Sequence, residues 1–197
     1  MKPDLAYLVG ALRDGSAYYD KNSRNYKIIW YENSQEWLKN SIMKRAYNVF
    51  KKNPRLEEYK RNYFRVVISS QKVFNIIKKD FEFISPQEKW QTPKSIKNSS
   101  QHIIATYVAG FFDAEGDINT KKYMIGFSQK NKEALEFIRD WLNRNSIKTS
   151  KIFIADKKSK TKRFYITSKE NFKKFSDLVK FEHPDKVNRF GILLQQT

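Results

Sequence analysis

The feature that most constrains this chain is a short segment design that occurs twice. An apolar helical pattern with small residues runs into an acid and then a glycine, at Leu5–Gly15 and again at Tyr107–Asp117. The acids are Asp14 and Glu115, and each following glycine suits the left-handed turn that often closes a helix. Because the helix dipole disfavours a carboxylate at a C-terminal end, we expect a compensating cation near both acids. The repeat predicts a pseudo-symmetric protein that brings two carboxylates together.

Small residues within both segments indicate how the two acids can meet. Gly10 and Ala11 in the first helix, and Ala109 and Gly110 in the second, remove side-chain bulk from one face. Two helix backbones can then approach closely, and parallel packing places their C-terminal ends together. Carboxylates, carbonyl oxygens and water are hard ligands suited to Mg²⁺. Such a centre fits metal-assisted cleavage of a phosphodiester.

The charge of the chain narrows its partners. Lys and Arg total 39 among 197 residues against 21 Asp and Glu, a formal net charge of +18. Such an excess is self-repelling in a folded protein, so a large polyanion is the natural counterpart. Hydrophobic residues at 40% and aromatic residues at 15% are too many for a disordered basic tail. The composition therefore favours a folded nucleic-acid-binding protein.

Residues that are scarce exclude other classes. The sequence has no cysteine, which excludes disulfides and cysteine-based zinc modules. His102 and His183 are its two histidines, which argues against nucleases built on histidine. No stretch approaches the roughly 18 apolar residues of a membrane span, and no secretory signal opens the chain. We therefore predict a cytoplasmic protein with no membrane contact.

Self-similarity continues beyond the two acidic segments. Matching stretches change from a period of two to one of about 3.6 residues, as a strand running into a helix does. They are Tyr26–Leu38 with Tyr123–Leu135, and Phe64–Ser70 with Arg163–Ser168. Ser70 and Ser168 are well placed as helix N-caps. Each half thus reads as helix, strand pair, helix, strand pair, helix.

We predict an α/β (α+β) fold with antiparallel strands in two pseudo-symmetric halves. The halves are residues 1–84 and 101–197, and the Pro-, Ser- and Lys-rich residues 85–100 form the linker. The predicted strands include Arg55–Asn62, Tyr63–Ser69, Lys151–Ala155 and Lys162–Thr167.

On these residues the chain resembles the monomeric LAGLIDADG homing endonucleases that carry two motifs, particularly the archaeal intron-encoded type. Tyr107–Asp117 matches the motif well. In the first copy Val9 takes the place of the usual glycine and Gly10 lies one position late. A shifted helix register is one explanation of this difference.

The resemblance implies an αββαββα fold in each half, with two saddle-shaped antiparallel sheets that bind double-stranded DNA. It implies that Asp14 and Glu115 bind two or three divalent ions, normally Mg²⁺ with Mn²⁺ able to substitute. The backbone carbonyls of Arg13 and Ala114 are the expected additional ligands. The implied activity is cleavage of both strands of a long asymmetric target, leaving short 3′ overhangs. Duplicated halves make a monomer sufficient.

Polar residues at the strand–helix junctions are the next catalytic candidates. They are Gln129 and Lys130 in the second half, and Glu32 and Asn33 in the first. Lys130 is suited to stabilising charge on the reacting phosphate or to tuning a water, although a solvated lysine near a helix start is an equal alternative. Because the first-half pair lacks a cation, we predict unequal cutting of the two strands.

Basic residues on predicted strands and hairpin turns are the DNA-binding candidates. Such residues contact phosphates or read guanine in the major groove. They are Arg24, Lys27, Arg61, Arg65, Lys121, Lys122, Lys151, Lys157, Lys158, Lys160, Lys162 and Arg163, with Tyr26 as an aromatic candidate. For Tyr26, core packing is an equal alternative.

Two other functions remain open from the sequence. An intron maturase or a non-cleaving DNA-binding protein on the same scaffold would share the fold and the charge. A basic RNA-binding protein of unrelated fold is the third alternative. Paired acids favour cleavage, because a protein that only binds nucleic acid has no need of them.

Overall fold

Two antiparallel sheets of four strands each organise the chain. The computed structural model describes residues 1–195. The strand order is β1-β2-β4-β3 in the first sheet and β5-β6-β8-β7 in the second. Because both sheets have the same order and each contains only antiparallel pairs, the predicted pseudo-symmetric α+β architecture is confirmed.

The strands have the following bounds. The first sheet contains β1 (Gly15–Asp20), β2 (Asn25–Glu32), β3 (Arg55–Lys60) and β4 (Tyr63–Ser69). The second contains β5 (Gly116–Asn119), β6 (Met124–Gln129), β7 (Phe153–Asp156) and β8 (Thr161–Ile166).

The helices occupy most of the remaining chain. In the first half they are α1 (Pro3–Ala11), the 3₁₀ turn η1 (Leu12–Asp14), α2 (Gln35–Trp37), the π-helical η2 (Leu38–Met43), α3 (Lys44–Phe50), α4 (Gln71–Asn75) and the π-helical η3 (Ile76–Asp80). Between the sheets lie the 3₁₀ turn η4 (Gln87–Lys89) and α5 (Lys94–Lys97). The second half adds α6 (Gln101–Glu115), α7 (Lys132–Arg144), α8 (Lys169–Leu178) and α9 (Pro184–Gln195).

The boundaries of three predicted strands need correction. β3 ends at Lys60 rather than Asn62, because Asn62 adopts a left-handed conformation (φ 57°) in the turn before β4. β7 begins at Phe153 rather than Lys151, and β8 runs from Thr161 to Ile166. The register shifts between Ile154 and Asp156, so the pairing of β7 with β8 is irregular near the turn that joins them. The predicted N-caps are correct, since the side chains of Ser70 and Ser168 accept hydrogen bonds from the first turns of α4 and α8.

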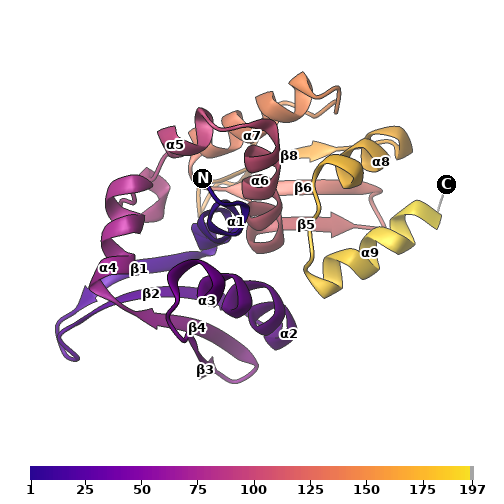
Figure 1. The fold of residues 1–197 in the computed structure, drawn as a ribbon. Coiled ribbons are helices and arrows are strands. Elements are labelled where there is room, and N and C mark those ends of the chain that lie inside the picture. The colour runs from indigo at the N-terminus through magenta and orange to yellow at the C-terminus, as the bar shows by residue number, and fades with distance from the viewer. Residues whose placement is uncertain (196–197) are drawn as a thin grey trace.

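The centre of the molecule is the packing of α1 against α6 (Figure 1). A Cβ atom added to Gly10 would meet the Tyr107 carbonyl, and one added to Gly110 would meet the Tyr7 carbonyl. The contact is reciprocal, so Gly10 is the structural counterpart of Gly110. The two backbones touch there because neither glycine carries a side chain.

The shifted register of the first motif has a geometric explanation. The chain from Gly10 to Asp14 ends in the 3₁₀ turn, whereas the chain from Gly110 to Glu115 is α-helical throughout. One α-helical step and three 3₁₀ steps rise about 7.5 Å, as do five α-helical steps. The tighter turn therefore carries Asp14 as far along the axis as Glu115, with one residue fewer.

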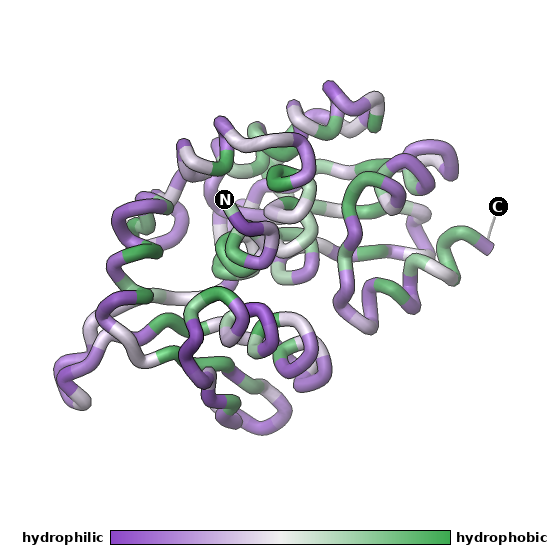
Figure 2. The backbone as a smooth tube through the Cα atoms, in the orientation of Figure 1, coloured by the Kyte–Doolittle hydropathy of each residue, from purple (hydrophilic) through white to green (hydrophobic). Residues whose placement is uncertain are grey.

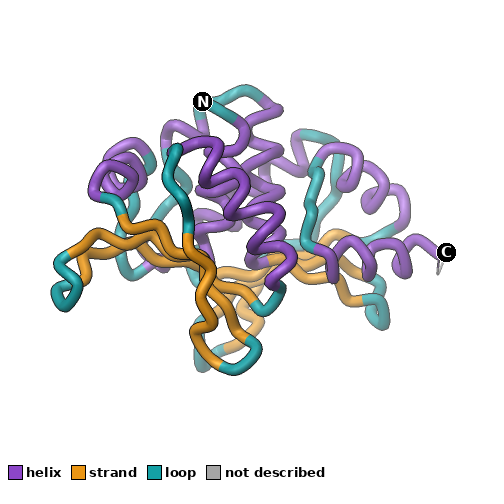
Figure 3. Tube along the Cα trace, turned by 60° about the horizontal axis from the view of Figure 1, so that its bottom comes forward, coloured by secondary structure: helices purple, strands orange, loops and turns teal. Residues whose placement is uncertain are grey.

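Helices cover one face of the sheets and leave the other open. Figure 3 shows strands along one side of the molecule, with helices on the opposite side and hairpin loops at the margins. Apolar residues gather where the sheets meet the helices (Figure 2). Trp30 illustrates the arrangement, since it is fully buried and its indole N–H donates to the Leu8 carbonyl in α1. Among residues 1–195 no helix has both the length and the apolar character needed to cross a membrane.

The segment between the sheets is more ordered than a flexible tether. Trp90 is fully buried, with its indole N–H donating to the Phe81 carbonyl. The guanidinium of Arg13 stacks over the Trp90 ring and donates to the carbonyls of Trp90 and Gln91. This segment therefore packs against the end of the first motif helix.

Candidate active site

Both acidic motif ends open into one cavity between the halves. Its volume is about 370 Å³, and we call it the acid-pair cavity. It is lined by Arg13, Asp14, Pro86, Gln87, Glu88, Glu115, Ser128, Gln129, Lys130 and Thr161. Parallel packing of α1 and α6 is what brings Asp14 and Glu115 to it, as the small residues in both helices predicted.

The electrostatics of the two acids indicate a site short of positive charge. Burial and the neighbouring Asp14 raise the pKa of Glu115 to about 8. Partial burial and the nearby Glu32 raise the pKa of Asp14 to about 6. Two carboxylates that disfavour each other's ionisation are stabilised in the ionised form by a shared cation.

The donor atoms at the cavity fit a hard divalent cation. Glu115 and Asp14 supply carboxylate oxygens, and the carbonyl of Arg13 lies within 3.5 Å of the Gln129 amide nitrogen beside them. Oxygen-only donor sets of this kind suit Mg²⁺ and Mn²⁺. Within residues 1–195 no cluster of three or more acidic or histidine side chains could hold a metal by itself. An ion here would therefore complete its shell with carbonyls, water and phosphate oxygens.

The structure brings both second-half candidates to this cavity. The Gln129 amide donates to Glu115 Oε1 at 2.7 Å, and Gln129 is buried. Lys130 is exposed and lines the cavity, with its backbone N–H bonded to the Gln129 side chain. Gln129 thus fixes one oxygen of Glu115, while Lys130 offers a mobile positive charge.

The first half presents different chemistry at the corresponding positions. Glu32 and Gln129 occupy corresponding positions in the two sheets. Glu32 lies opposite Phe64 of β4, and Gln129 lies opposite Lys162 of β8. Glu32 is close enough to Asp14 to raise its pKa. Burial, Asp14 and Glu32 together raise the pKa of the Tyr63 hydroxyl to about 12. This side of the site therefore carries carboxylates and phenols where the other carries an amide and an ammonium.

Several residues of the site were not found from the sequence. Gln87, in the connecting segment, donates its amide to the carbonyls of Leu12 and Gly15 at the end of the first motif. Asn131 donates to the carbonyls of Glu88 and Trp90, which ties the same segment to α7. The sequence signal was only a proline-rich linker, so its role as a wall of the cavity comes from tertiary packing.

The sequence also did not reveal the role of Lys186, a buried lysine of the C-terminal helix α9. The ammonium group of Lys186 donates to the carbonyls of Phe112 (2.7 Å) and Asp113 (2.6 Å), near the end of α6. Asp113 itself accepts hydrogen bonds from the Tyr7 hydroxyl and from the backbone N–H groups of Glu182 and His183. The last turn of the second motif helix is therefore held by the chain that leads into α9.

The predicted DNA contacts gather on hairpin turns at the margins of the sheets (Figure 3). Most are exposed, at Arg24 before β2, Arg61 between β3 and β4, Lys121 and Lys122 between β5 and β6, and Lys157, Lys158 and Lys160 between β7 and β8. Lys151, just before β7, is exposed as well. Phosphate contacts along a duplex need cations spread in this way.

Three other candidates on the strands already hold acidic partners. Lys27 pairs with Asp20 at 2.5 Å, and Arg65 pairs with Glu57 at 2.8 Å. Arg163 pairs with Asp117 and crosses over Gly126, where a Cβ atom would displace it. Such pairs fix the direction of each cation on the open face of the sheet.

Two of the DNA-binding candidates, Tyr26 and Lys162, lie on the helix side of the sheets and not on the open face. Tyr26 points to the helix side, where its half-buried ring packs 4.8 Å from that of Phe74 in α4, as the packing alternative predicted. Lys162 shares the side of Gln129, and its ammonium donates to the Lys130 carbonyl at 3.1 Å. Because alternate residues of a strand face opposite sides, both positions follow from register.

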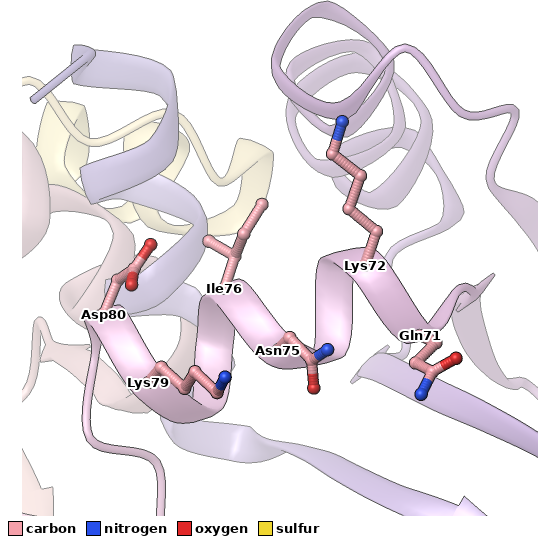
Figure 4. Close-up of a pocket in the computed structure, with 6 residues that line it drawn as sticks. All are labelled: Gln71, Lys72, Asn75, Ile76, Lys79 and Asp80. Atoms are coloured by element: carbon pink, nitrogen blue, oxygen red, sulfur yellow. The ribbon is translucent and has the colours of Figure 1, made fainter.

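A larger hollow lies elsewhere, on the outer face of α4 and η3 (Figure 4). Its volume is about 450 Å³, and it is lined by Gln71, Lys72, Asn75, Ile76, Lys79 and Asp80. Asp80 is its one carboxylate, so it lacks the paired acids that distinguish the smaller cavity.

Comparisons with known proteins agree with the fold. A family model described as a LAGLIDADG-like domain matches residues 102–180. The homing endonuclease I-ApeI of Aeropyrum pernix is 34% identical over 196 residues, covering 96% of this chain and 86% of the relative.

Solved structures resemble the chain over nearly its whole length. I-DmoI in complex with DNA and Mn has a TM-score of 0.71 at 18% identity, covering 92% of this chain and 98% of that one. Full-length DUF199/WhiA from Thermatoga maritima has a TM-score of 0.64 at 16% identity, covering 99% of this chain and 61% of that one. At these identities the structural likeness establishes the fold alone.

Proposed function

The chain belongs to the LAGLIDADG homing endonuclease family, and from this premise we propose that it is a site-specific, divalent-metal-dependent DNA endonuclease. One observation carries the proposal. The two motif acids, from the ends of two helices packed in parallel, meet in one cavity between the two sheets. A protein that only binds nucleic acid would gain nothing from two repelling carboxylates at this position.

The sheets bind and orient the DNA in this proposal. Cations on the hairpin turns contact phosphates along the duplex, and strand residues on the open face read the bases between them. Because the two sheets present different side chains, the target is long and asymmetric. The scissile phosphates of the two strands then lie near the acid pair.

Asp14 and Glu115 would hold the divalent ions, together with the backbone carbonyls of Arg13 and Ala114. The ions, Mg²⁺ or Mn²⁺ and two or three in number, would supply an activated water and neutralise charge on the phosphate. Gln129 orients Glu115 by donating to one of its oxygens. Lys130 adds positive charge beside the leaving and attacking oxygens, where it stabilises the transition state. Each strand is cut once, leaving short 3′ overhangs.

We also propose that the protein acts as a monomer and inside the cell, where its duplex substrate is found. Two motifs in one chain supply both acids, so a second copy is unnecessary for the cut. Sedimentation of the protein–DNA complex and fractionation of cells test these two points.

Cleavage of a randomised duplex library in Mg²⁺ tests the proposed function. Wild type should recover one long site, whereas Asp14→Asn and Glu115→Gln should lose double-strand cleavage at that site. Asp177→Asn removes an exposed acid from α8 and should cut as wild type does. Tight binding by wild type without cleavage in Mg²⁺ or Mn²⁺ would replace the proposal with a maturase or a DNA-binding protein.

A further inference from the structure

The C-terminal helix delivers a buried lysine to the end of α6, behind the acid-pair cavity. Lys186 is 8% exposed, and its ammonium donates to two carbonyls at the end of α6. The Lys186 ammonium also lies 5.4 Å from the centre of the Phe112 ring. Every polar contact of this side chain is therefore directed at the last turn of the second motif helix.

This placement is unfavourable for α9 taken alone. Lys186 is the third residue of the helix, where the helix dipole disfavours a cation. Burial is costly as well, and it lowers the pKa of Lys186. Both penalties are offset at α6, where carbonyl groups at a helix C-terminus favour a cation. The lysine is thus better explained by what it does for α6 than by what it does for its own helix.

Carboxylates of both halves surround this ammonium. Asp113, Glu32, Glu115 and Asp117 all favour its charged form. In the opposite direction, Lys186 favours the ionised forms of Asp14 and Glu115.

The neighbouring histidine does not share this role. His183 Nε2 lies 3.9 Å from Glu32 Oε2, but burial and Lys186 lower the pKa of His183 to about 4. His183 is therefore neutral near pH 7, and the positive charge at this end of the site comes from Lys186.

We propose that Lys186 is a positioning residue of the cleavage reaction, which fixes the carbonyl end of α6 and places its ammonium group behind the acid pair. The inference rests on the proposed function. The second half has Lys130 beside its centre, whereas Glu32, Asn33 and Tyr63 of the first half carry no positive charge. Lys186, brought across by α9, adds a second buried cation to that of Arg13, and both favour the ionised form of Glu115. It lies behind the site, where it would touch neither DNA nor metal.

Two consequences follow for the reaction. The end of α6 is held in one place, so Glu115 is oriented before DNA arrives. The fixed charge also offsets part of the repulsion between the acids and the approaching phosphate, which lowers the barrier without consuming a ligand position. Divalent ions, by contrast, are repelled by the same charge.

The first test compares Lys186→Met with Arg189→Met in the full chain on the recovered target. Methionine keeps the length of the side chain over Phe112 but removes its charge. Arg189 is an exposed residue of the same helix that pairs with Asp185, so its substitution removes the same charge without touching α6.

We predict that the loss of this charge slows cleavage but leaves DNA affinity nearly unchanged. Lys186→Met should slow single-turnover cleavage by about 10- to 100-fold, while DNA affinity in EDTA changes by less than about threefold. Titration of Mn²⁺ by electron paramagnetic resonance, on a complex with a non-hydrolysable duplex, should show about threefold or more tighter binding. Arg189→Met should leave rate and Mn²⁺ affinity unchanged. A structural defect would instead weaken DNA binding, metal binding and rate together, and that result would overturn the inference.

A chemical rescue covers the case in which Lys186→Met folds poorly. The sequence has no cysteine, so Lys186→Cys carries a unique thiol that can be alkylated in denaturant before refolding. Bromoethylamine forms a C–S bond with loss of bromide and restores an ammonium, whereas iodoacetamide forms a neutral amide. Recovery of rate with the first reagent alone supports the inference, and equal rates with both overturn it. If wild type itself does not cleave, the proposed function fails, which is a separate outcome.

Discussion

At the scale of single residues, the acids of the site lie where their charged forms are disfavoured. Burial and the nearby Asp14 raise the pKa of Glu115, and burial and the nearby Glu32 raise the pKa of Asp14. Functional sites commonly contain such perturbed groups, because the arrangement serves a ligand rather than stability. Removing a charge from the pair should therefore stabilise the protein in the absence of metal.

Thermal unfolding of Glu115→Gln in EDTA tests this expectation. The pKa of Glu115 is raised from 4.5 to about 8, so its charge penalty is absent below pH 4.5 and complete above pH 8. The variant should unfold at the same temperature as wild type near pH 4.5. At pH 9 it should be more stable by up to several kcal/mol, because each unit of pKa shift corresponds to about 1.4 kcal/mol. A stabilisation that does not grow with pH would contradict the assignment.

At the scale of elements, contact between two helix backbones sets the geometry of the site. Gly10 and Gly110 allow α1 and α6 to touch, and the 3₁₀ turn at Leu12–Asp14 brings the first acid level with the second. A side chain at either glycine would meet backbone atoms, which cannot rotate away. The two positions are therefore more demanding than an ordinary helical glycine.

Alanine substitutions should distinguish a glycine at the contact between α1 and α6 from an ordinary helical glycine. Gly110→Ala should destabilise the protein by about 1–3 kcal/mol, because its Cβ would overlap the Tyr7 carbonyl. Gly191→Ala is the matched control, because Gly191 is also helical and a Cβ atom there meets nothing within 4 Å. It should stabilise by about 0.5–1 kcal/mol. Denaturant unfolding measures both, and equal effects would refute the close-contact account.

At the scale of the whole molecule, two basic halves face one duplex. The second sheet ends in a turn that carries Lys157, Lys158 and Lys160, all exposed. With a net charge of +18, the chain should bind DNA through many phosphate contacts. Such contacts release counterions and make affinity depend steeply on salt.

Salt titration of DNA binding measures the number of these contacts. Between low and physiological salt the affinity should fall by more than about tenfold. Replacing Lys157, Lys158 and Lys160 with Gln should flatten the slope of log affinity against log salt by about three. An unchanged slope would place this turn away from DNA.

The inequality between the halves should also appear in the order of cutting. We predict that one strand is nicked first, because Lys130 has no basic counterpart at Glu32 or Asn33. With differently labelled strands, Lys130→Met should slow the faster cut about tenfold or more, whereas Lys132→Met, at an exposed ion pair with Glu136, should not. Equal nicking rates on both strands in wild type would contradict this prediction.

Local sequence determined the parts of this protein that depend on neighbours along the chain. The paired motifs, the caps at Ser70 and Ser168 and the strand alternation follow from periodicity and side-chain chemistry, and together they predicted two matching halves with Asp14 and Glu115 at their meeting point. Tertiary structure decided what depends on residues far apart in sequence. The wall formed by Gln87 and the buried ammonium of Lys186 have no local signature, because the partners of each lie some 70 residues or more away in the chain. Their roles arise only when packing brings the connecting segment to the cavity and the C-terminal helix to the end of α6 behind it.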